Sequence, residues 1–118
     1  MLLADTSAWH RSGHPAVTEE WSRLLDRDEI ATSAPVRLEV LYSARSAKHY
    51  AELSEELDSL HQLPCGEPAM DRALWVQRQL AEKHALHHRS VKIPDLLIAA
   101  AAELGGATLW HYDEDYDR

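Results

Sequence analysis

Five acidic residues stand beside apolar segments of this chain, where an unpaired carboxylate is energetically costly. The set is Asp5, Glu39, Asp95, Asp113 and Asp115, and Asp95 opens the most apolar segment. Gathered in one cleft, these carboxylates would repel one another unless cations were bound. Oxygen ligands without cysteine or a required histidine suit Mg²⁺ or Mn²⁺. The chemistry that such a site supports best is phosphoryl transfer.

Each acid also has an ordinary structural interpretation. Asp5 would cap a helix that starts at the following Thr6-Ser7, and Asp95 would interact with the dipole of its own helix. Glu39 would be a solvated helix residue, and Asp113 would belong to a solvated acidic turn. The joint pattern is more specific than any single member, so we expect one shared site.

The elements that must position these acids alternate between strand and helix. We expect strands at 1–5, 30–33, 61–63 and 108–112, and helices at 15–27, 35–45, 47–60, 69–86 and from 94 to the glycines at 105–106. This order predicts an α/β fold with a mainly parallel sheet. Ligands bind beyond the carboxyl ends of the strands in such sheets, so the acids should meet at one edge. In the helix 69–86 we expect the following residues to face inward: Met70, Ala73, Leu74, Leu80 and Ala81.

Length and charge limit the class of protein. The 118 residues suffice for one domain, 1–118, and the net charge is −8. That charge argues against a general electrostatic nucleic-acid binder, but cations can bridge acidic residues to phosphate. Cys65 is the sole cysteine, and the longest apolar run has seven residues, far below the roughly 20 of a membrane span. We expect a soluble cytoplasmic protein without a signal peptide.

Four motifs resemble those of the PIN-domain nucleases. Leu3-Ala4-Asp5-Thr6-Ser7 is similar to the opening D-T-S motif, and Arg37-Leu38-Glu39-Val40-Leu41 to the segment with the central Glu. The segment 94–100 resembles P-D-x-x-I-A-A, and 109–117 resembles the closing D-x-D-F/Y-D motif. Order and spacing match along the whole chain. The short chain and His87-His88-Arg89 before the third motif look most like VapC, the toxin of VapBC toxin–antitoxin modules.

The resemblance implies a three-layer α/β/α PIN fold with a four- to five-stranded sheet, and a Mg²⁺-dependent ribonuclease that cleaves structured RNA such as tRNA or rRNA. It also implies a VapB antitoxin partner and a toxin homodimer. Asp5, Glu39, Asp95 and Asp113 would hold the metal, Asp115 would be a fifth member, and Ser7 would orient a carboxylate or water. Two departures stand out: Trp110-His111 replaces a common Thr, and the family's terminal strand has no counterpart before Arg118.

The remaining polar and aromatic residues suggest weaker hypotheses. A local basic rim for RNA would include Arg11, Arg45, Lys48, Arg89 and Lys92, unless these are ordinary solubilising charges. The histidines at 84, 87 and 88 are expected to be solvated rather than metal-binding, and the four tryptophans to be core or interface anchors. An apolar groove between the helices 15–27 and 47–60 is an expected antitoxin site.

Three other functions remain as alternatives. A phosphoacceptor module of receiver type also uses an acidic Mg²⁺ pocket, but it needs paired acids after the first strand and a late Lys, and no Lys follows Lys92. A phosphatase with an Asp nucleophile needs D-x-D where this chain has Asp5-Thr6-Ser7. A catalytically silent binding partner would bind an antitoxin without cleaving RNA.

Overall fold

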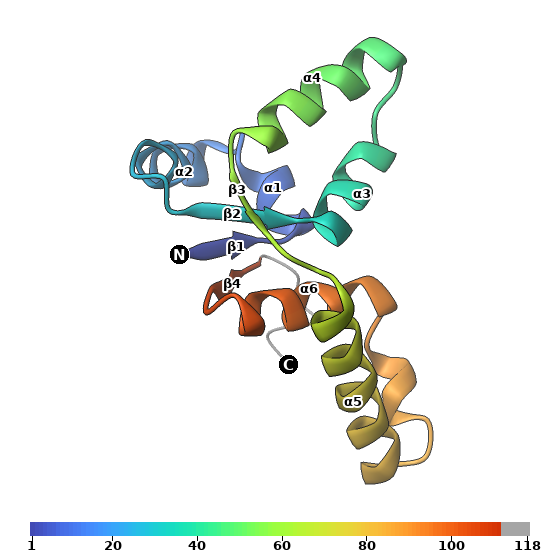
Figure 1. Ribbon diagram of the computed structural model, residues 1–118. Coiled ribbons are helices and arrows are strands. Elements are labelled where there is room, and N and C mark those ends of the chain that lie inside the picture. The colour runs from blue at the N-terminus through green and yellow to red at the C-terminus, as the bar shows by residue number, and fades with distance from the viewer. Residues whose placement is uncertain (112–118) are drawn as a thin grey trace.

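The computed structural model describes residues 1–111 and shows alternating strands and helices (Figure 1). The elements follow in the order β1 (Leu2–Ala4), α1 (Thr6–Arg11), α2 (Pro15–Asp26), β2 (Ile30–Ser33), α3 (Ala34–Tyr42), α4 (Ala47–Asp58), β3 (His61–Leu63), α5 (Glu67–Lys83), η1 (His87–Ser90), α6 (Ile93–Leu104) and β4 (Thr108–Trp110). The expected strands at 30–33 and 61–63 are confirmed with the same bounds.

The four described strands form one parallel sheet in the order β3-β2-β1-β4. Helices α1 to α4 lie on one side of this sheet, and α5 and α6 lie on the other (Figure 1). Side chains alternate between the two faces of a strand. Trp110 of β4 accordingly packs on Trp21 of α2, whereas Leu63 of β3 lies against the end of α6 at Gly105. The predicted three-layer α/β/α architecture is confirmed.

The main core fills the space between the sheet and its flanking helices. Its fully buried large side chains include Leu3, Ile30, Leu57 and Ile98. A second, smaller cluster joins α5 to α6 through small residues, among them Ala69, Ala73 and Ala100. Small side chains let two helices pack closely, so α5 is attached mainly through α6.

The prediction of the buried face of α5 was partly wrong. Met70 and Leu74 are 46% and 63% exposed, and Ala81 is exposed as well. Ala73 is buried, and Leu80 is partly buried against the small cluster. The helix packs on α6 along a stripe that includes Ala69 and Ala73, and it also contacts η1. Tyr50 of α4 and Leu25 of α2 are also partly in solvent, with 48% and 41% of their surface exposed.

Local interactions set the helix ends, which differ from the expected bounds at the end of α3 and the start of α5 and agree with them at the end of α6. Helix α3 ends at Tyr42 because Ser43 donates a hydrogen bond to the carbonyl of Val40 and Ser46 then caps α4. Helix α5 begins two residues early, at Glu67, because Pro68 suits a first turn. Helix α6 ends at Leu104, and Gly106 takes φ +66°, a left-handed conformation that favours glycine.

Candidate active site

Asp5 lies directly after β1, at the carboxyl end of the sheet. Its backbone N–H donates to the carbonyl of Trp110 at the end of β4, with a distance of 3.0 Å. Its Oδ1 accepts from the backbone N–H of Ala8 at 3.0 Å and from the hydroxyl of Ser7 at 2.6 Å. The residue is only 3% exposed. Asp5 therefore caps α1, as the structural interpretation expected, and its Oδ2 accepts no hydrogen bond from residues 1–111.

Glu39 is connected to the Asp5 turn by one side-chain contact. Thr6 Oγ1 donates to Glu39 Oε1 at 2.9 Å, although the two residues are 33 positions apart. Glu39 is partly buried on α3, between the buried residues Val36 and Val40. The bond fixes one carboxylate oxygen and leaves Oε2 able to take another partner. Thr6 was not assigned a role from sequence, because its partner depends on how α1 packs on α3.

Asp95 occupies the first turn of α6. Its side chain is partly buried and makes no hydrogen bond or ion pair within residues 1–111. Figure 1 shows that α3 and α6 begin on the side where β1 and β2 end. A hollow of about 210 Å³ is lined by both Glu39 and Pro94, so the first turn of α6 adjoins α3. Asp5, Glu39 and Asp95 thus lie toward the same edge of the sheet, and their meeting in one site stays a prediction.

The described acids do not by themselves form a complete metal cage. Within residues 1–111, no three histidine, cysteine, aspartate or glutamate residues are grouped closely enough to hold a metal ion. Asp113 and Asp115 lie outside the described residues. Three of the five acids thus lie toward one edge of the sheet. That all five form one metal site stays a prediction.

Two buried hydroxyls near this edge were not anticipated. Thr32 and Ser33 at the end of β2 are each 1% exposed, and their hydroxyl oxygens have no hydrogen-bond partner within residues 1–111. Because Leu3 pairs with Ala31, Ser33 is level with Asp5 on the neighbouring strand. A buried unpaired hydroxyl costs about 1–3 kcal/mol. No periodic pattern in the sequence signals such a position.

The predicted basic rim is spread over several elements. Arg11 is exposed at the end of α1, Arg89 is exposed in η1, and Lys92 is exposed immediately before α6, three residues from Asp95. Arg45 and Lys48 are exposed around the start of α4. His84 and His87 are exposed, as expected for solvated histidines, whereas His88 is partly buried.

The other chemically notable side chains have structural surroundings. Trp21 contacts Trp9 and Trp110, with ring centroids 5.8 and 5.4 Å apart, so these three residues are anchors as predicted. Trp75 lies under the guanidinium of Arg72, 4.4 Å from the ring centroid. Burial raises the pKa of the Cys65 thiol, which keeps it protonated and weakly nucleophilic near neutral pH.

Comparison with known proteins decides the family. The PIN-domain family matches residues 2–118. Ribonuclease VapC18 from Mycobacterium tuberculosis (strain ATCC 25618 / H37Rv) is 55% identical over 118 residues, which are all of this chain and 86% of that protein. The chain belongs to the VapC family of PIN-domain proteins. Another VapC relative, Ribonuclease VapC21 from the same strain, is 38% identical over 117 residues, 98% of this chain and 83% of that protein.

A solved structure supports the VapC fold independently. The crystal structure of FitAcB from Neisseria gonorrhoeae matches with a TM-score of 0.60 and covers 98% of this chain and 89% of that chain. The sequence identity is 21%, so this likeness shows the shared fold alone. No helix within residues 1–111 has the length and apolar content to cross a membrane.

Proposed function

We propose that this VapC chain is a Mg²⁺-dependent endoribonuclease, the toxin of a type II toxin–antitoxin system, acting on structured RNA such as tRNA or rRNA. The observation that carries the proposal is the Thr6–Glu39 hydrogen bond beside the buried Asp5. This bond joins Glu39 to the residue that follows Asp5, at the carboxyl edge of the sheet. The family to which the chain belongs includes proteins named ribonucleases. No observation favours the receiver-type or phosphatase alternative over this function.

The residues present fit magnesium by ligand type. Mg²⁺ is usually held by one or two carboxylates together with water and substrate phosphates, so a complete protein cage is not required. Asp5 and Asp95 are the proposed main ligands, with Glu39 and Asp113 beside them and Asp115 as an additional member. The unpaired Ser33 hydroxyl offers a further polar group for an ordered water at this edge. Mn²⁺ should substitute because it has similar ligand preferences.

The proposed mechanism assigns different tasks to these acids. The cation, when bound, supplies positive charge that polarises the phosphate and lowers the pKa of water. Glu39, oriented by Thr6, accepts the proton of the attacking water, or Asp113 does so. Ser7 fixes the orientation of Asp5 through its hydrogen bond of 2.6 Å. In-line attack then leaves a 5′-phosphate and a 3′-hydroxyl.

The test uses purified protein and total RNA. Cleavage is expected with Mg²⁺ and should disappear with EDTA, with Asp5→Asn and with Asp95→Asn. Sequencing the new 5′ ends identifies the target RNA and the position of cleavage. Cleavage that survives EDTA or either substitution would contradict the assignment of these acids to a metal site.

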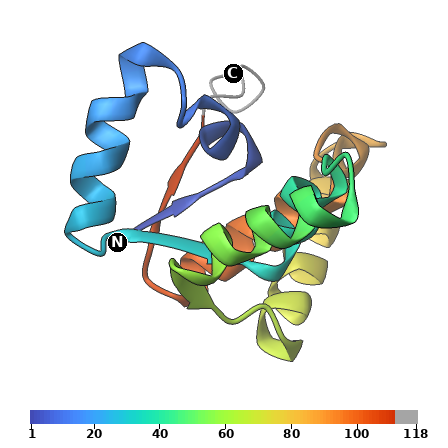
Figure 2. The ribbon, with the colours of Figure 1, turned by 90° about the horizontal axis from the view of Figure 1, so that it is seen from above.

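The proposed partners are a VapB-type antitoxin and a second toxin chain. A hollow of about 160 Å³ lies between α2 and α4, where the groove was expected, and is lined by Trp9, Trp21, Leu25, Glu56, Ser59 and Leu60. Figure 2 shows these two helices lying apart on the same side of the sheet. Leu25→Glu should weaken binding of the antitoxin without reducing RNA cleavage, as measured by titration calorimetry. Unchanged affinity would exclude this groove.

A further inference from the structure

Tyr42 is an aromatic residue placed beside the proposed acidic site with its side chain in solvent. It is the last residue of α3 and is 92% exposed. A single exposed aromatic residue is ordinary on a protein surface. Its position is informative because a hollow of about 270 Å³ is lined by Tyr42 together with Thr6, Leu38 and Glu39. The Thr6–Glu39 hydrogen bond thus forms part of the same hollow.

Helix geometry explains why these residues share one surface. Glu39 and Tyr42 are three positions apart, and Leu38 and Tyr42 are four apart, which are the spacings of neighbours on a helix surface. Val36, Val40 and Leu41 are buried on the opposite side of α3. The aromatic ring is therefore carried by a helix that is fixed in the core, so little backbone entropy is lost when a ligand binds.

The chemistry around Tyr42 favours a nucleic-acid base. Arg45 and Lys48 follow on the adjoining turn and the start of α4, both exposed and without an ion pair within residues 1–111. RNA loops are recognised when unpaired bases stack on aromatic side chains while basic groups contact the phosphates. Along the chain, the carboxylate of Glu39 is followed by the ring of Tyr42 and then by the cations of Arg45 and Lys48. These are the types of group that such recognition requires.

A larger hollow with a mainly apolar lining lies elsewhere on the molecule. It has about 340 Å³ and runs between α5 and α6, where Met70, Leu74 and Ile93 are among its lining residues. Tyr42 does not line it. An apolar surface of this kind suits a protein partner better than the Tyr42 hollow, whose lining includes the Glu39 carboxylate and the Thr6 hydroxyl.

From this placement we propose that Tyr42 is a stacking platform for an unpaired RNA base next to the scissile phosphate. The inference rests on the proposed ribonuclease function and adds a substrate-positioning residue to it. Arg45 and Lys48 contact the phosphates of the same RNA segment. Stacking tolerates every base, so this contact holds the strand in place and does not by itself select a sequence.

The experiment measures binding separately from cleavage. All proteins carry Asp95→Asn to block cleavage, and the probe is a fluorescent RNA hairpin with an unpaired loop, titrated with protein in Mg²⁺ by anisotropy. Tyr42→Ala should raise Kd about tenfold. Tyr42→Phe keeps the ring and should retain the affinity, whereas Tyr42→Leu keeps the apolar bulk and should not. Trp75→Ala, on α5, is the matched control and should leave Kd unchanged.

A second probe tests stacking directly. Loops that lack one base at a time are titrated with the Tyr42 protein and with its Tyr42→Ala variant. At one loop position, removal of the base should weaken binding to the Tyr42 protein about tenfold and have little effect on the variant. Equal losses for both proteins at every position would overturn the inference.

Sedimentation velocity distinguishes the rival occupant, a second copy of this chain. A change in oligomeric state caused by Tyr42→Ala would assign the residue to a protein interface and overturn the inference. Tyr42 is too exposed for its removal to unfold the chain, and a melting curve verifies this. Absence of cleavage by the chain without Asp95→Asn would contradict the ribonuclease proposal, whereas unchanged RNA binding by Tyr42→Ala contradicts the stacking inference alone.

Discussion

The two proposed metal-binding aspartates are held in different ways. Asp5 is 3% exposed, and its Oδ1 accepts two hydrogen bonds that also start α1. Asp95 is partly buried in the first turn of α6 and makes no side-chain hydrogen bond within residues 1–111. Asp5 therefore stabilises α1 in addition to its proposed role as a metal ligand. Asp95 is positioned by its helix backbone alone, so substitutions should separate stability from activity.

The largest effect is expected from Asp5→Ala. The substitution removes a proposed ligand and the cap of α1, so cleavage should fall more than the roughly 10- to 100-fold that loss of an outer partner costs. Stability should fall by about 1 kcal/mol, or roughly 4 °C in Tm. Asp5→Asn should lose the activity but keep the Tm, because Asn caps as well as Asp. Equal melting temperatures for the Ala and Asn variants would contradict the capping role.

Asp95→Ala should abolish cleavage to a similar extent with a smaller effect on folding. The side chain contributes only its interaction with the helix dipole, about 0.3–1 kcal/mol. Differential scanning calorimetry together with an RNA cleavage assay measures both quantities. A loss of stability as large as that of Asp5→Ala would show that the two acids are held alike.

Thr6→Val should reduce kcat about tenfold, because Glu39 loses the hydrogen bond that orients it. Thr6→Ser keeps a donor at the same position and should retain most of the activity. The ratio of kcat values for the two variants measures the contact. If Thr6→Val cleaved RNA as fast as the unsubstituted chain, Glu39 would not depend on Thr6.

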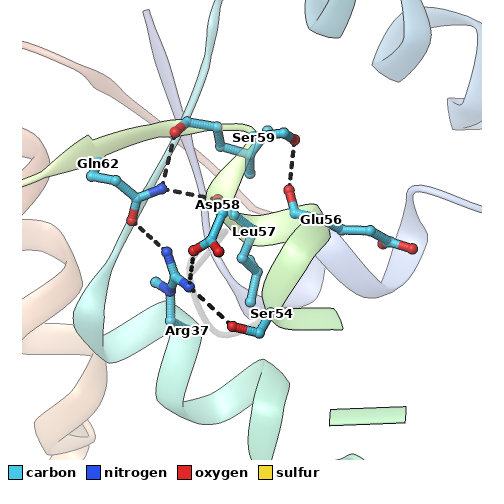
Figure 3. A network of polar contacts seen from close by, with 8 residues as sticks. Arg37, Ser54, Glu56, Leu57, Asp58, Ser59 and Gln62 are labelled. Atoms are coloured by element: carbon cyan, nitrogen blue, oxygen red, sulfur yellow. Dashed lines mark hydrogen bonds and ion pairs between the residues drawn. The ribbon is translucent and has the colours of Figure 1, made fainter. Parts of the chain in front are cut away.

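Arg37→Ala should have the smallest effect, and on stability alone. Arg37 lies two residues from Glu39 but belongs to a different network, in which it donates to Asp58 at 2.5 Å, Gln62 at 2.8 Å and Ser54 at 3.4 Å (Figure 3). Its loss should lower stability by about 0.5–1.5 kcal/mol without changing kcat. Arg78→Ala removes an exposed pair with Glu82 and is the control, with no measurable change in Tm.

Local patterns were sufficient where one segment determined its own structure. The strands at 30–33 and 61–63, the stop of α6 near the two glycines and the apolar character of that helix were all predicted. Patterns failed where packing decided the outcome. The periodicity of α5 allowed several inward faces, and only contact with α6 buried Ala73 while leaving Leu74 63% exposed.

The candidate site likewise has some features that the sequence predicted and others that depend on tertiary packing. The sequence alone predicted which residue types would carry the chemistry, because carboxylates beside apolar segments require a compensating partner. It also determined the order of elements that brings Asp5, Glu39 and Asp95 to one edge of a parallel sheet. Only the tertiary structure decided that Thr6 donates to Glu39, that the buried Ser33 hydroxyl has no partner among residues 1–111, and that Tyr42 is exposed beside Thr6 and Glu39. These contacts join elements that are distant along the chain, and no local periodicity encodes them.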